Sequence, residues 1–221
     1  MEFSLHRQLK ELYASCPEQI EVRCGRFRID VMTDKELIEI QHGSLSAIRN
    51  KVKQLLGRYS VTVVKPIIVR KTLVNLSRRG GKIIGKRKSP KTGRLLDVFH
   101  ELTYFTRVFP AKNLKLEVPL IDVEEWRFPG HGRRRRWRER DFVVQDQKLI
   151  AVHETHKFRI AGDLWDVVGA DLPSPFHSGD VAAATQAPRW VAQRVVYCLR
   201  NMGAAKTVGK QGNALLYKRC A

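Results

Sequence analysis

The first apolar residues of the chain recur every three or four positions, which predicts one face of an amphipathic helix. They are Leu5, Leu9, Leu12 and Tyr13. From residue 19 to 41 the pattern changes, and apolar and polar residues alternate around Gly25 and around Thr33–Asp34. Alternation interrupted by turn residues is typical of short antiparallel strands. The chain is therefore expected to begin with a helix followed by three strands.

The helical period returns between residues 44 and 59, and a buried strand is predicted to follow it. This segment starts at Ser44, a good cap, and stops at Gly57. Residues 61–69 are mostly apolar and β-branched, as in a strand covered on both faces. Residues 1–75 thus predict the order α–β–β–β–α–β, a compact mixed α/β unit whose second helix is a crossover.

The remaining residues divide into two further parts. Residues 65–96 contain eleven basic residues and no acidic one, which indicates a flexible basic hairpin or loop. Residues 97–160 predict a β-rich extension with one helix. The last sixty residues carry three helical patterns followed by two short strands across "GKQGN". Ser178 is expected to cap the second helix, and the third helix is expected to begin at Pro188.

Composition points to a polyanionic partner. The 221-residue chain has 41 Lys and Arg against 22 Asp and Glu, a formal charge of +19. Nucleic acid is the commonest partner of so basic a chain. The four cysteines show no close pairing, the N-terminus has no signal-peptide pattern, and no apolar run is long enough to span a bilayer. These features predict a cytoplasmic protein with reduced thiols and no membrane role.

The candidate chemistry lies in "IDVMTDKELIEIQH", residues 29–42. Strand alternation places Glu39 and Gln41 on one face, and a hairpin can bring Asp30 beside them. Two carboxylates and a third oxygen ligand would make a site for Mg²⁺ or Mn²⁺, which polarises a phosphodiester and activates water. The same spacing also fits the solvated face of an ordinary pair of strands.

These residues resemble the PD-(D/E)XK nuclease superfamily, in particular the competence-protein (CoiA-like) group, in which "DV…IEIQ" precedes a long helix. The resemblance covers residues 2 to about 70. It implies a restriction-endonuclease-like core in which Asp30 and Glu39 bind the metal ion. Gln41 stands where the superfamily usually has Lys, and a neutral amide can orient water but supplies no charge.

Members of the superfamily also often place a Glu on the first helix, facing the metal. Glu2 shares the helix face of Leu5 and Leu9, so it is the candidate, although an acidic residue at a helix N-terminus is also favoured by the helix dipole. Glu21 on the first strand is a weaker candidate.

The C-terminal segment "RWVAQRVVYCLRNMGAAKTVGKQGNALLYKR" resembles winged helix-turn-helix domains, in which the third helix enters the major groove and the wing contacts the backbone. Such domains also mediate protein contacts. Together with the basic runs, this resemblance implies contacts with DNA. The residues expected to make them are Lys86, Arg87, Lys88, Arg134, Arg135, Arg136, Arg189, Gln193, Arg200 and Lys210.

The sequence therefore predicts an α/β protein with a nuclease-like core (1–75), a basic β-rich extension (76–160) and a winged helix (161–221). The expected function is Mg²⁺- or Mn²⁺-dependent DNA cleavage. A non-catalytic DNA-binding protein that retains the nuclease scaffold and a basic RNA-binding protein are the alternatives. A homodimer is compatible with cutting both strands.

Overall fold

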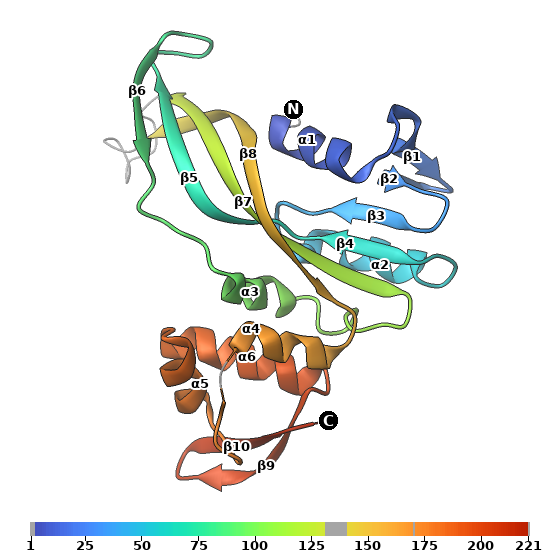
Figure 1. The fold of residues 1–221 in the computed structure, drawn as a ribbon, viewed down its shortest axis with the longest axis vertical. Helices are drawn as coiled ribbons and strands as arrows, with labels where there is room; N and C mark the ends of the chain where they lie inside the picture. The colour runs from blue at the N-terminus through green and yellow to red at the C-terminus, as the bar shows by residue number, and fades with distance from the viewer. Residues whose placement is uncertain (1–2, 131–140, 170, 221) are drawn as a thin grey trace.

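The computed structural model describes residues 3–130, 141–169 and 171–220, and its first elements follow the predicted order (Figure 1). They are α1 (Ser4–Tyr13), β1 (Ile20–Cys24), β2 (Phe27–Met32), β3 (Leu37–Ile40), α2 (Arg49–Leu55) and β4 (Val61–Val64). The apolar run predicted as one strand is divided in two, because Pro66 lacks an N–H for the ladder. The chain continues as β5 (Ile67–Leu76) after this break.

One mixed sheet organises most of the chain, with β7 (Leu114–Pro129) in its middle. The first part of β7 pairs with β4 in parallel, its second part pairs with β5 in parallel, and β8 (Phe142–Phe158) runs antiparallel along its other edge. β6 (Ile83–Lys88) pairs with β5, so the basic segment predicted as a hairpin or loop is a hairpin. The residues expected to form an extension instead complete the sheet begun by residues 1–64.

The face of the sheet under α1 is apolar. Leu5 and Leu9 are 1% and 0% exposed and pack against Val31, and a fully buried aliphatic side chain contributes about 1.5–3 kcal/mol. The predicted burial of Leu12 is wrong, because it is 59% exposed. Lys10 is buried in its place, with its Nζ 2.6 Å from Glu21.

The opposite face carries the larger core, which joins the sheet to the C-terminal helices. It includes Val52 of α2, Phe99 of α3 (Val98–Leu102), and Val195 and Leu199 of α6 (Arg189–Asn201), all 0% exposed. Figure 1 places α3 between the sheet and α6. The C-terminal residues therefore share one continuous apolar cluster with the sheet.

The C-terminal part has the predicted three helices followed by a hairpin. They are α4 (Trp165–Val168), α5 (Ser178–Thr185), α6 (Arg189–Asn201), β9 (Ala205–Gln211) and β10 (Ala214–Arg219). Phe176 forms an isolated antiparallel bridge with Tyr217 of β10. The cap of α5 is His177 rather than Ser178, and His177 and Asp180 bond each other's backbone N–H groups.

Short 3-10 helices complete the described residues, at Pro17–Gln19, Leu45–Ala47, Leu95–Asp97 and Ala161–Leu164. Within the part of the chain that the structure describes, no helix has the length and apolar character to cross a membrane. All four cysteines lie in that part, and none of them forms a disulfide.

Candidate active site

Asp30 lies where β2 and β3 separate. The two strands pair only through Val31 with Ile38 and Met32 with Leu37. Beyond this point the Ile40 N–H donates to Asp30 Oδ2 at 2.8 Å, so a side chain takes the place of a backbone acceptor. His6 of α1 brings its Nε2 to 3.5 Å from the same oxygen. The carboxylate is therefore fixed between a strand and a helix.

The environment of Asp30 favours its ionised form. Burial raises the pKa of this carboxyl, but hydrogen bonds from His6 and from the Ile40 N–H, together with the positive charges of His6 and Lys51, lower it below its ordinary value. Asp30 is consequently a carboxylate at neutral pH.

Glu39 has the opposite tendency. Its side chain faces α2 and the residue is only 3% exposed, and burial raises its pKa to about 7, with a further increase from the charge of Asp30. The bond to Lys51 acts in the other direction, since Lys51 Nζ lies 2.6 Å from Glu39 Oε1. Lys51 also donates to the carbonyl of Arg28 on β2. The charge of Asp30 thus acts on Glu39, and the two carboxyls differ in protonation near pH 7.

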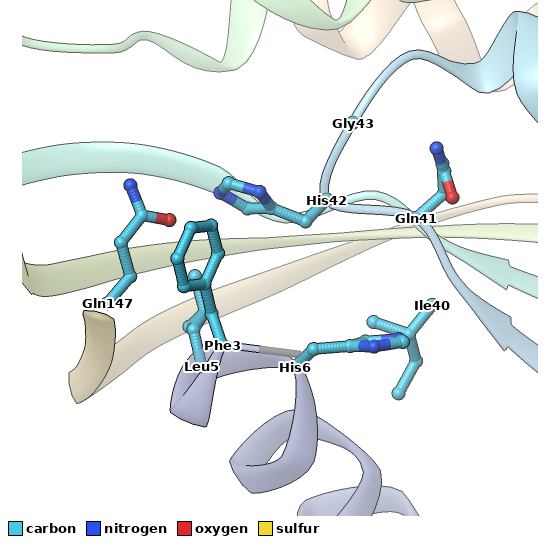
Figure 2. A pocket seen from close by; sticks show the side chains of 8 residues that line it. All are labelled: Phe3, Leu5, His6, Ile40, Gln41, His42, Gly43 and Gln147. Carbon is cyan, nitrogen blue, oxygen red and sulfur yellow. The ribbon is translucent and has the colours of Figure 1, made fainter. Parts of the chain in front are cut away.

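Gln41 follows β3 and points away from His6 (Figure 2). Its backbone N–H donates to the Val64 carbonyl at 2.8 Å, which continues the pairing with β4. Its side-chain Nε2 donates to the Ser44 carbonyl at 2.9 Å. The amide nitrogen therefore stabilises the loop after β3, and the amide oxygen is the atom available to orient a water molecule.

Lys65 and Glu101 hold the loop after β3 in place. Lys65 is 6% exposed and donates to the carbonyls of His42 at 2.9 Å and Gly43 at 2.5 Å. Glu101 of α3 accepts from the Leu45 N–H at 2.9 Å and lies 3.7 Å from Lys65. Ser44 caps the short helix that starts at Leu45, as its position predicted.

The residue that α1 brings to the site is His6. Glu2, predicted for this role, lies outside the described residues. Glu21, the weaker candidate, bonds Lys10 and Arg28 instead. His6 had no sequence signal, because nothing in the local pattern reveals which strand residue a helix will meet.

Lys51 was also missed, although the sequence contained a signal for it. Ile48, Val52 and Leu55 form the apolar row of α2, and Lys51 lies on the same side of the helix at spacings of three and four. A cation on an apolar helix face indicates a partner carboxylate beneath it. Glu39 is that partner.

The fit of this site to a divalent cation rests on its oxygen donors. Asp30 and Glu39 are hard ligands of the kind that Mg²⁺ and Mn²⁺ take, and Mg²⁺ commonly keeps several waters beside one or two carboxylates. Among residues 3–130, 141–169 and 171–220 there is no group of three or more His, Cys, Asp or Glu side chains that could hold a metal ion. Within these described residues, the site therefore offers a cation the two carboxylates Asp30 and Glu39.

A second candidate surface lies between α6 and the β9–β10 hairpin. A groove of about 310 Å³ is lined by Arg189, Gln193, Tyr197 and Arg200 of α6 and by residues 213–215 of the hairpin. Seven basic residues and no acidic one occur between residues 189 and 219. The groove therefore has a single sign of charge.

The structure brings together three of the predicted DNA-contact residues in this groove, namely Arg189, Gln193 and Arg200. Lys210 is exposed on β9. Lys86, Arg87 and Lys88 are exposed on β6, away from α6, and Lys86 is bonded to Glu124 at 2.5 Å. Arg134, Arg135 and Arg136 lie outside the described residues. Tyr197 was missed, although its spacing of four from Gln193 places it on the same helix face.

Comparisons with known proteins give a family and a relative. The model of a family described as "Domain of unknown function (DUF8091)" matches residues 3–159, which contain the whole sheet with Asp30 and Glu39. An uncharacterized protein of Treponema pallidum (strain Nichols) is 27% identical over 219 residues, covering 99% of this chain and 85% of the relative. No solved structure matches.

Proposed function

The chain belongs to the DUF8091 family, and we propose that it is a divalent-metal-dependent endonuclease that binds DNA through its C-terminal helices and hairpin. The observation that carries this proposal is the meeting of Asp30 and Glu39 where β2 and β3 separate. The charge of Asp30 raises the pKa of Glu39, and a cation between the two carboxylates would offset their repulsion.

The arrangement of the surrounding elements supports the proposal. The order α–β–β–β–α–β, with β3 parallel to β4 and α2 as the crossover, agrees with the resemblance of residues 2–70 to the PD-(D/E)XK superfamily. In that reading the sheet is a restriction-endonuclease-like core. Asp30 and Glu39 stand at the positions of the two motif carboxylates.

The proposed roles of the residues follow from their contacts. Asp30 and Glu39 would hold Mg²⁺ or Mn²⁺, which when bound polarises a phosphodiester and lowers the pKa of water. His6 and the Ile40 N–H keep Asp30 ionised and oriented. Gln41 would accept a hydrogen bond from water through its amide oxygen. Lys51 provides beside Glu39 the positive charge that Gln41 lacks.

The proposed DNA contact is a winged helix. In this reading α4, α5 and α6 are its helices, the Phe176–Tyr217 bridge and β9–β10 are its small sheet, and α6 enters the major groove. Arg189, Gln193 and Arg200 would face the DNA, with Lys210 on the wing. The exposed Lys88 of β6 would add non-specific phosphate contacts.

One observation favours a second function, that of a DNA-binding protein without catalysis. Lys51 Nζ lies 2.6 Å from Glu39 and already neutralises this carboxylate. A nuclease scaffold that is retained only for binding would contain a side-chain cation such as Lys51 in place of the metal ion, and an uncharged residue such as Gln41. The competing interpretations therefore differ in whether Lys51 leaves Glu39 when a metal ion arrives.

Nicking of supercoiled plasmid in the presence of Mn²⁺ tests the proposal. Asp30→Asn and Glu39→Gln should each lower the rate at least about 100-fold, because each removes a negative ligand while retaining the size of the side chain. Glu36→Gln is the matched control, since Glu36 lies before the other end of β3 and bonds Lys115 and Thr62. Full activity of both site variants would contradict the assignment. A wild type that binds duplex without cutting would establish the second function, and preference for RNA at equal salt would indicate an RNA-binding protein.

A further inference from the structure

A cavity of about 260 Å³ adjoins the candidate active site on the side of α1 (Figure 2). It is lined by Phe3 and His6 at the start of α1, by Ile40 and His42 at the end of β3, and by Gln147 of β8. Residues from three elements, α1, β3 with the loop after it, and β8, therefore line one space.

A buried hydrogen-bond acceptor faces this cavity. Gln147 is 7% exposed, and its Nε2 donates to Glu125 Oε2 at 3.0 Å. Lys71 Nζ also donates to this oxygen at 2.7 Å, so Glu125 Oε2 accepts from both groups. The amide must therefore present its oxygen on the other side.

That oxygen lacks a partner among the described residues. Gln147 Oε1 is buried and accepts no hydrogen bond there, and Figure 2 shows it directed toward Phe3 and His42. A buried polar atom without a partner is costly. A ligand with an N–H group would remove this cost.

The other walls suit a flat aromatic ligand. Phe3 and His42 bring two rings to the cavity, and Leu5 and Ile40 add apolar surface. Burial lowers the pKa of His42, and the charges of Lys65 and Lys71 lower it further, so its ring is neutral at pH 7 and can both donate and accept. Stacking surfaces combined with a few fixed polar atoms are what protein pockets use to hold a nucleobase.

The cavity lies directly beside Asp30. His6, which lines it, approaches Asp30 Oδ2 to 3.5 Å, and Ile40, which also lines it, donates its N–H to that oxygen. A nucleotide in the cavity would thus place its phosphate near the two carboxylates.

From this arrangement we propose that the cavity binds an unstacked nucleobase of the strand held at Asp30 and Glu39, with Gln147 Oε1 accepting from its Watson–Crick edge and Phe3 and His42 stacking on it. This inference rests on the proposed nucleic-acid substrate. It predicts that the protein selects single-stranded, mismatched or flexible sites, at which a base leaves the stack at the lowest cost.

Binding of oligonucleotides in EDTA tests the inference without any need for cleavage. A single abasic position is moved along the strand, and the affinity of each strand is measured for the wild type, Gln147→Leu and Phe3→Leu. At one position the abasic change should weaken wild-type binding about 10-fold. In both variants this position should lose its effect, because the pocket no longer distinguishes a base from a gap. Gln145→Leu is the control, since Gln145 lies on the same strand and bonds the Gly80 N–H instead.

Equal abasic effects in the wild type and in folded Gln147→Leu and Phe3→Leu proteins would overturn the inference. Titration with free nucleosides distinguishes the source of the base. Nucleoside binding that Gln147→Leu abolishes, without any abasic effect, would overturn the claim that the base belongs to a strand. Because the experiment measures binding, a protein that never cuts DNA can still show the abasic effect, and a protein that cuts DNA can still lack it. Failure of this inference is therefore distinguishable from failure of the proposed nuclease function.

Discussion

The candidate active site and the α6 groove use charge in opposite ways. Residues 1–64 contain ten basic and eight acidic residues, whereas residues 189–221 contain seven basic residues and no acidic one. At the active site Glu39 and Asp30 are mostly buried, and each has a basic partner. In the groove Arg189 and Arg200 are exposed on a surface of one sign. Buried paired charges suit chemistry at a fixed place, and exposed charges of one sign suit binding to phosphates.

The two regions nevertheless share one core. Phe99 on α3 belongs to the same apolar cluster as Val52 under the sheet and Leu199 on α6. Its carbonyl also accepts a hydrogen bond from the thiol of Cys198. The difference between the regions is therefore one of surface chemistry, and they are expected to unfold together.

The largest change in the free energy of unfolding is expected for Phe99→Ala, which would show whether the two regions unfold together. Removing this fully buried ring leaves a cavity and should lower the free energy of unfolding by about 3–5 kcal/mol. Urea unfolding followed by hydrogen exchange in β4 and α6 should show one shifted transition for both. Phe142→Ala is the control, because Phe142 is 44% exposed and its truncation should lower the free energy of unfolding much less. Loss of protection in α6 alone would show that the regions are separate.

The protonation of Glu39 in the active-site region should make the stability of the folded chain depend on pH. Its pKa is about 7 in the folded chain and near 4.5 when unfolded, so between these values the folded chain holds a proton that the unfolded chain has lost. The free energy of unfolding should therefore fall as the pH rises from 5 to 8 in EDTA, by about 3 kcal/mol. Urea unfolding at a series of pH values measures it, and Glu39→Gln should remove most of this dependence.

The partner of Glu39 supplies the control for this pH effect. Lys51→Met removes the bond that lowers the pKa of Glu39, so the pH range of the stability loss should move upward. Mn²⁺ should diminish the loss in the wild type, because a cation favours the ionised carboxylate. A wild type whose stability does not change between pH 5 and 8 would contradict the burial of Glu39 as a protonated group.

The smallest effect is expected for the groove, where contacts are exposed and additive. Arg189→Ala combined with Arg200→Ala should weaken duplex binding about 10-fold and reduce the slope of log K against log salt by about 2, since each lost phosphate contact contributes about 0.9. Lys35→Ala with Lys53→Ala is the control, because both lysines are exposed outside the groove and the charge change is equal. At saturating DNA the nicking rate of the groove variant should recover, whereas that of Glu39→Gln should not. Equal loss in both double variants would indicate a response to net charge alone.

The sequence predicted the helices and strands that have a local periodic pattern. It did not predict which strands pair when they are distant along the chain. The helices and strands of residues 1–64 and of the last sixty residues appear in the predicted order. The place of β7 in the middle of the sheet was not predictable, because its pairing with β4 and β5 joins residues about fifty positions apart. The burial of Lys10 in place of Leu12 likewise depends on Glu21, which lies on another element.

The sequence by itself determined the period of each segment, the excess of positive charge and the presence of Asp30, Glu39 and Gln41 around one turn. Only the tertiary structure decided that His6, Lys51 and Gln147 surround them, since these residues come from α1, α2 and β8. The physical reason is the distance along the chain between the residues that interact. Helical and strand periods arise from neighbours a few residues apart, whereas the ionisation of Asp30 and Glu39 is set by residues that the packing of distant elements brings within hydrogen-bonding distance.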